Sequence, residues 1–94
     1  MPLYVVIPLD KKEAVNKAVM GLPQEDIYRL KGDSGWIVRY KGTSKELTRS
    51  LGIGVEDDNG GISSVGSALI VSLTTYYGFG PSDMWEWIGT RAEA

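Results

Sequence analysis

Residues 3–9, LYVVIPL, constrain the fold of this chain most, because apolar side chains occupy both the odd and the even positions. A strand with one wet face alternates apolar and polar residues. A strand that is apolar at both parities instead fits the middle of a sheet, where both of its faces are covered. We therefore predict a central strand here. Pro8 falls near its end, where a missing backbone N–H donor is tolerated.

Two stretches carry the start signals and the spacing of helices. DKKE (10–13) predicts a helix with Asp10 as its N-cap, followed by an apolar stripe over residues 14–22. TSKE (43–46) is a second capping box, and it predicts a short helix that ends at Gly52.

Three further stretches have the composition of strands. DIYRLK (26–31) and WIVRYK (36–41) flank a glycine-containing turn, which predicts a hairpin. SALIVSLTT (67–75) predicts the last strand. The Gly-, Ser- and acid-rich residues 53–66 predict a mobile loop.

The predicted order is strand–helix–strand–strand–helix–strand, followed by a short helix that Ser82 caps and that ends before Gly89. This order is typical of the ferredoxin-like α+β fold βαββαβ, a four-stranded antiparallel sheet with two helices on one face. The residues expected to face the core are Trp36, Val38, Tyr40, Leu69, Val71 and Leu73. Those expected on the uncovered face are Arg29, Lys31, Ile37, Arg39, Lys41, Ile70, Ser72 and Thr74.

Composition narrows the chemistry that the chain can perform. Its 94 residues, 43% of them hydrophobic, and its net charge of −2 fit one small folded domain over residues 1–94. There is no histidine and no cysteine. The usual general base near neutral pH, thiol nucleophiles, disulfides and the commonest metal ligands are therefore excluded. We expect no cofactor.

Charge and hydropathy suggest where the chain acts. Residues 27–49 carry six cations against two carboxylates, whereas residues 50–94 carry one cation against six carboxylates. This asymmetry predicts head-to-tail pairing that weakens with salt. No basic leader precedes the first apolar run, and no apolar run approaches the length of a membrane span, so we expect a cytoplasmic protein without membrane contact.

The stretch TTYYGFGPSDMWEWIGTR (74–91) holds five of the nine aromatic residues. Trp85 and Trp87 lie about 200° apart on a helix, so we expect Trp85 to pack inside and Trp87 to contact a partner. Tyr76 and Tyr77 join Trp87 as predicted interface anchors. The predicted charged contacts are Arg29, Lys31, Arg39 and Lys41.

The element order, the short length and the acidic residue directly after the first strand, in YVVIPLD, resemble a group of small ferredoxin-like proteins. The group comprises the CRISPR adaptation subunit and its SinR-like and VapD-like relatives. Its members form homodimers, and some cleave nucleic acid with a divalent metal that a dimer-paired aspartate holds at the end of the first strand. The resemblance therefore implies a homodimer and makes Asp10 a candidate metal ligand, beside its simpler role as a helix cap.

The sequence favours a non-enzymatic interaction domain that forms a homodimer and binds a protein partner. On size alone, it suits an accessory product of a phage or another mobile element. Two alternatives stay open. One is a metal-dependent nuclease or nucleic-acid-binding protein that uses Asp10 and the basic hairpin. The other is a small-molecule binder with its pocket between the sheet and the YYGFG loop.

Overall fold

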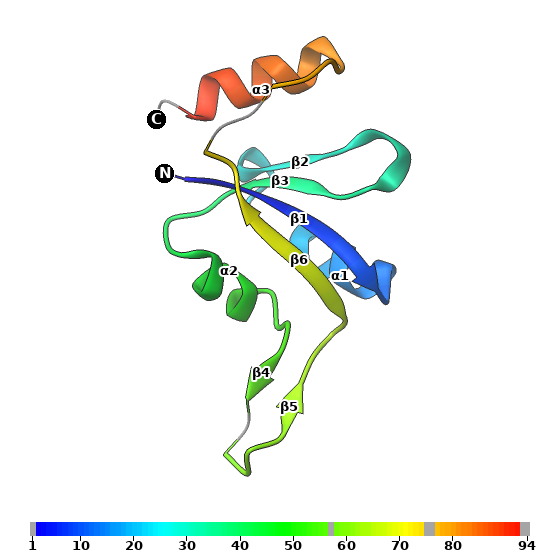
Figure 1. The fold of residues 1–94 in the computed structure, drawn as a ribbon, viewed down its shortest axis with the longest axis vertical. Helices are drawn as coiled ribbons and strands as arrows, with labels where there is room; N and C mark the ends of the chain where they lie inside the picture. Colours follow the sequence, from blue (N-terminus) through cyan, green and yellow to red (C-terminus); the bar gives the residue numbers. More distant parts are fainter. Residues whose placement is uncertain (1, 57, 75–76, 93–94) are drawn as a thin grey trace.

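The fold is built around β1 (Leu3–Asp10), a central strand as predicted. The computed structural model describes residues 2–56, 58–74 and 77–92. It forms a four-stranded antiparallel sheet in the order β2 (Ile27–Arg29), β3 (Trp36–Arg39), β1 and β6 (Ser67–Ser72) (Figure 1). Pro8 pairs with Ala68 of β6. On the other side of β1, the position opposite Pro8 lies outside β3, which begins at Trp36, so the missing backbone N–H of Pro8 removes no hydrogen bond to that strand.

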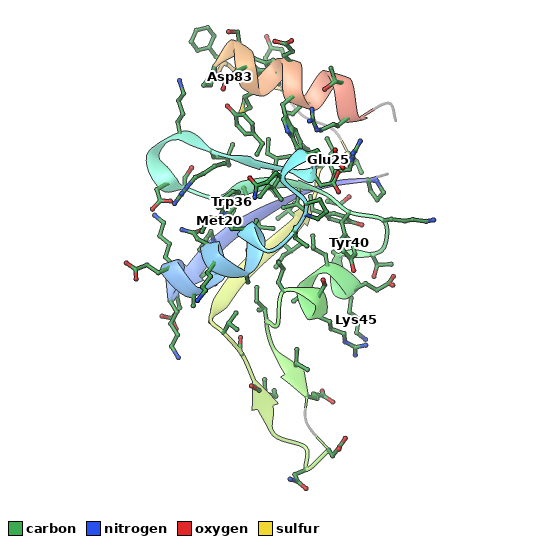
Figure 2. All side chains as sticks on the ribbon, turned by 180° about the vertical axis from the view of Figure 1, so that it is seen from behind. Met20, Glu25, Trp36, Tyr40, Lys45 and Asp83 are labelled. Carbon is green, nitrogen blue, oxygen red and sulfur yellow. The ribbon has the colours of Figure 1, made fainter. Side chains whose placement is uncertain are left out.

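Two helices cover one face of the sheet, which we call the helix face. They are α1 (Lys12–Met20) and α2 (Ser44–Ser50), and the predicted capping box of Thr43 and Glu46 is formed at the start of α2. The core on this face comprises Tyr4, Val6, Val15, Val19, Ile27, Trp36, Val38, Leu47, Leu51 and Ile53. Figure 2 shows Trp36 beside α1, where its Nε1 donates to Oδ1 of the buried Asn16 at 2.8 Å.

The prediction that Asp10 caps α1 is wrong. β1 continues through Asp10, which pairs with Ser67 after a register shift that follows Pro8. Lys11 then occupies the N-cap position with a left-handed φ of 48°, and its side chain forms no capping hydrogen bond. Backbone pairing with β6 therefore keeps Asp10 in the strand, although the sequence pattern assigns it to the start of the helix.

The third helix, α3 (Ser82–Ala92), lies on the opposite side of the sheet from α1 and α2 (Figure 1). It is longer than predicted and continues through Gly89, which is exposed. Ile88 of α3 is buried against Leu3 and Ile37, each about 3% exposed. The sheet therefore lies between two layers of helix, but α3 covers only the β2–β3 side and one end of β1.

Residues 53–66 are not the loop that their composition predicted. Two short strands, β4 (Val55–Glu56) and β5 (Ile62–Ser63), pair antiparallel into a hairpin inserted between α2 and β6. This hairpin, which we call the arm, projects from the body and gives the molecule principal extents of 46 × 26 × 22 Å (Figure 1). The α+β class, the antiparallel sheet and the C-terminal helix are confirmed, and the arm is the departure from the predicted element order.

The two faces of β6 are the reverse of the prediction. Ala68 and Ile70 pack against the core on the helix face, whereas Leu69 and Val71 point to the other side. The register explains this orientation, since Ile70 lies opposite the fully buried Val6 and therefore shares its face.

Candidate interaction surface

The side of the sheet that carries α3 is only half covered. Cross-strand pairing places Val5 beside Val71 and Ile7 beside Leu69 on this side. The side chains of Leu69 and Val71 are 51% and 43% exposed, and those of Val5 and Ile7 are half-buried. We call these four residues the open face. It is a contiguous apolar surface on two adjacent strands.

β6 has a free edge, because no strand among the described residues pairs with it on the side away from β1. This edge adjoins the open face. The Leu73 N–H donates to the Leu3 carbonyl at 2.9 Å, which marks these residues as a hydrogen-bonded pair. Hydrogen-bonded and non-hydrogen-bonded pairs alternate along an antiparallel ladder, so every second residue of β6 directs its backbone groups away from β1. These outward groups, called the edge groups, are the N–H and C=O of Ala68, Ile70 and Ser72.

A second exposed apolar feature precedes α3. Tyr77 and Phe79 are fully exposed. Gly78 lies between them, and a Cβ placed on it would meet no atom of the described residues within 4 Å. Tyr77, which was predicted as an interface anchor, is one of these two exposed rings. Tyr76, predicted beside it as an interface anchor, lies outside the described residues.

Polar contacts at both ends of α3 tie the helix to β2 and to the 3-10 turn Gln24–Asp26 before it. The Tyr28 hydroxyl of β2 donates to Oδ2 of Asp83 at 2.6 Å, and Figure 2 shows Asp83 at the start of α3. This hydrogen bond raises the pKa of Tyr28 and lowers the pKa of Asp83 from their ordinary values. At the other end, Nε of Arg91 donates to the Glu25 carbonyl at 2.7 Å.

Both tryptophans of α3 pack against the cluster around Ile88, which corrects the expectation that only Trp85 would pack. Each is partly buried against the cluster around Ile88, one on either flank of the helix. The Trp87 ring lies 5.9 Å from the ring of Tyr28, and the Arg91 guanidinium lies 4.4 Å from the Trp87 ring. A large indole reaches the sheet from the side of the helix, so opposite helical angles do not force one ring into solvent.

Two of the predicted cationic contacts are held within the chain. Arg29 was expected on the uncovered face, but it pairs with Trp36 on the helix face, 5.2 Å from the indole ring and 2.7 Å from Asp33. A hydrogen bond from Arg29 is the main cause that lowers the pKa of Asp33, and a hydrogen bond from Lys12 lowers it further. Arg39 lies on the face opposite α1 and α2, as predicted, although α3 partly covers that face, and it forms an ion pair with Asp26 at 2.6 Å.

The other two predicted cations are exposed. Lys31 lies in the short 3-10 turn Lys31–Asp33 between β2 and β3, and Lys41 follows β3. These positions place the four cations on different sides of the sheet rather than on one surface. A groove of about 280 Å³ at the base of the arm was not predicted, and its charged lining comes from Lys45 and Arg49 of α2 and Glu56 of β4.

Asp10 is exposed at the end of β1. Within residues 2–56, 58–74 and 77–92, no three acidic side chains gather closely enough to hold a metal ion. In the same residues, no helix has the length and apolar character needed to cross a bilayer. Comparison with known proteins finds no matching family, no matching curated protein and no matching solved structure.

Proposed function

We propose that this chain is a small non-enzymatic interaction domain that works as a homodimer and presents the open face as its binding surface. We further propose that its frame is ferredoxin-like, with the arm as an insertion. The strand order β2-β3-β1-β6 and the placement of α1 and α2 on one face support that frame.

The observation that carries the proposal is the pair of half-exposed side chains of Leu69 and Val71 on a strand without charge. Single exposed apolar residues are common on protein surfaces and need no explanation. Here four apolar side chains adjoin one another across β1 and β6, and contiguous apolar surfaces of this kind mark interaction sites. Burying the exposed part of each side chain would stabilise a complex by about 1 kcal/mol.

A second copy of the chain fits this surface for two reasons. No charged residue occurs from Ser67 to Thr74, so two copies meet there without like-charge repulsion. A domain of this length also leaves a large share of its apolar surface in water, which self-association reduces. Nucleic acid suits the open face less well, because Arg29 and Arg39 are paired with carboxylates of the same chain.

The test is molar mass in solution, by size exclusion with light scattering, across a range of protein concentrations and at low and high salt. We expect a dimer whose dissociation constant changes little with salt, because apolar burial is not screened. Leu69→Lys should weaken it about tenfold or more, since a lysine would lose an apolar contact and introduce charge.

The matched control is Met20→Lys, which places the same charge on a residue of α1 that is 45% exposed and remote from the open face. It should dimerise like the wild type, and circular dichroism should show both variants folded. A wild-type chain that stays monomeric at the highest concentration would contradict the proposal. A dimer that dissociates in high salt would instead favour the head-to-tail charge pairing expected from the sequence.

A further inference from the structure

We infer that two copies pair antiparallel through the free edges of their β6 strands, which joins the two sheets into one continuous sheet across the dimer. This inference rests on the proposed homodimer and specifies the contact that forms it. Its starting point is the set of edge groups of Ala68, Ile70 and Ser72, which point away from β1.

The two edges of the sheet differ in how they are protected. β2 has only three residues, lies between the 3-10 turns Gln24–Asp26 and Lys31–Asp33, and carries a charge at Arg29. Short length, charge and irregular flanks are the usual devices that prevent an edge strand from pairing with another chain. β6 has six residues and contains neither charge nor proline. The edge of β6 is therefore the one suited to strand addition.

The positions of the edge groups restrict the register of the pairing. Hydrogen-bonded pairs must join edge groups to edge groups, and the registers that form at least two such pairs place the two-fold axis at Ile70 or at one of its two neighbours. Centring it on Ile70 pairs Ala68 of one copy with Ser72 of the other and uses all three edge residues. This register forms about six interchain hydrogen bonds, two for each pair.

Side-chain placement favours the same register. With Ile70 on the axis, Leu69 of one copy lies beside Val71 of the other, and the reverse contact forms by symmetry. These are the two most exposed residues of the open face. The two open faces then merge into one apolar band across the dimer. A two-fold contact is closed, so it ends at two copies and does not propagate into a filament.

Amide hydrogen exchange of the wild-type protein tests the pairing residue by residue. The N–H groups of Leu69 and Val71 bond to β1 in a monomer as well as in a dimer, so their exchange should depend little on concentration. The N–H groups of Ala68, Ile70 and Ser72 should exchange rapidly in dilute protein and slow by about tenfold or more as the dimer forms.

A pair of variants at one exposed residue provides the second arm. Ser72→Pro removes an edge N–H without removing a bond to β1, and it should weaken the dimer about tenfold or more. Ser72→Ala keeps the N–H and should dimerise like the wild type.

The outcomes separate the two proposals. A dimer in which Ala68, Ile70 and Ser72 exchange as fast as in dilute protein would overturn the edge pairing and leave the homodimer standing. A chain that is monomeric throughout would overturn the homodimer itself. The exchange experiment uses the unmodified chain, so it decides the question even if Ser72→Pro does not fold.

Discussion

Removing the Ile88 side chain should detach α3 from the sheet while leaving the core on the helix face intact. Ile88 is about 3% exposed and is the most deeply buried of the described side chains of α3, in contact with the cluster that contains Leu3 and Ile37. The fully buried residues Val6 and Val38, by contrast, belong to the core under α1 and α2. The two clusters lie on opposite faces, so the loss should stay local.

The expected cost of Ile88→Ala follows from this burial. Truncation of a buried isoleucine to alanine destabilises proteins by about 2–5 kcal/mol, and the lower part of that range applies where the site can collapse. We expect about 2–3 kcal/mol, because the cluster is small, with three buried residues among those described, and lies at the margin of the protein. For a domain of this size, such a loss lowers the melting temperature by about 10 °C or more.

Urea denaturation followed by tryptophan fluorescence and by far-ultraviolet circular dichroism measures this effect. The neighbouring substitution Gly89→Ala is the control, because Gly89 is exposed within the helix and its Cβ would meet no atom of the described chain within 4 Å outside the helix backbone. It should stabilise α3 by about 0.5–1 kcal/mol. If Ile88→Ala leaves the urea midpoint unchanged while Gly89→Ala raises it, then α3 does not pack on the sheet through Ile88. The conclusion that α3 covers half of this sheet face would then be wrong.

Three further predictions concern other contacts of the fold. The hydrogen bond between Tyr28 and Asp83 should persist from about pH 4 to pH 10. It should be lost as pH falls through the lowered pKa of Asp83 or rises through the raised pKa of Tyr28. In a fluorescence titration, Tyr28→Phe should remove both transitions. Gly35→Ala should lower stability by about 1–3 kcal/mol in thermal unfolding, because its Cβ would overlap the backbone oxygen of Val6 in β1; an unchanged melting temperature would contradict that close approach. Asn16→Ala should cost about 1–3 kcal/mol in urea denaturation, since it leaves the buried N–H of Trp36 without its acceptor, and the loss should shrink in a Trp36→Phe background.

The sequence predicts the framework of the sheet because its strands have strong local patterns. The apolar run that begins at Leu3 becomes the central strand β1, and WIVR becomes β3 beside it. The start of α2 follows from reciprocal hydrogen bonds between Thr43 and Glu46, which depend on three-residue spacing alone. Features that depend on neighbouring residues can therefore be predicted from the sequence.

Features that depend on distant contacts could not be predicted. Asp10 is a plausible helix cap by spacing, but pairing with Ser67 keeps it in the strand. Leu69 and Val71 form the more hydrophobic parity of β6, yet the register with Val6 turns Ile70 inward instead. The short strands of the arm leave no pattern in a Gly-, Ser- and acid-rich segment, because two pairs of residues are too few to show alternation.

β1 and β6 have the same kind of sequence, and comparing them gives the strongest argument for the proposed assembly. Both are apolar at the odd and at the even positions, which is the pattern of a strand in the middle of a sheet. β1 has β3 and β6 as neighbours, so its backbone groups are paired within one chain. Within the described part of the chain, β6 has β1 on one side only, and no strand pairs with the edge groups of Ala68, Ile70 and Ser72. Long, uncharged edge strands of this kind are templates for pairing with another chain. Pairing with the β6 of a second copy would place β6 inside a continuous sheet, as β1 is, and would set Leu69 of one copy beside Val71 of the other.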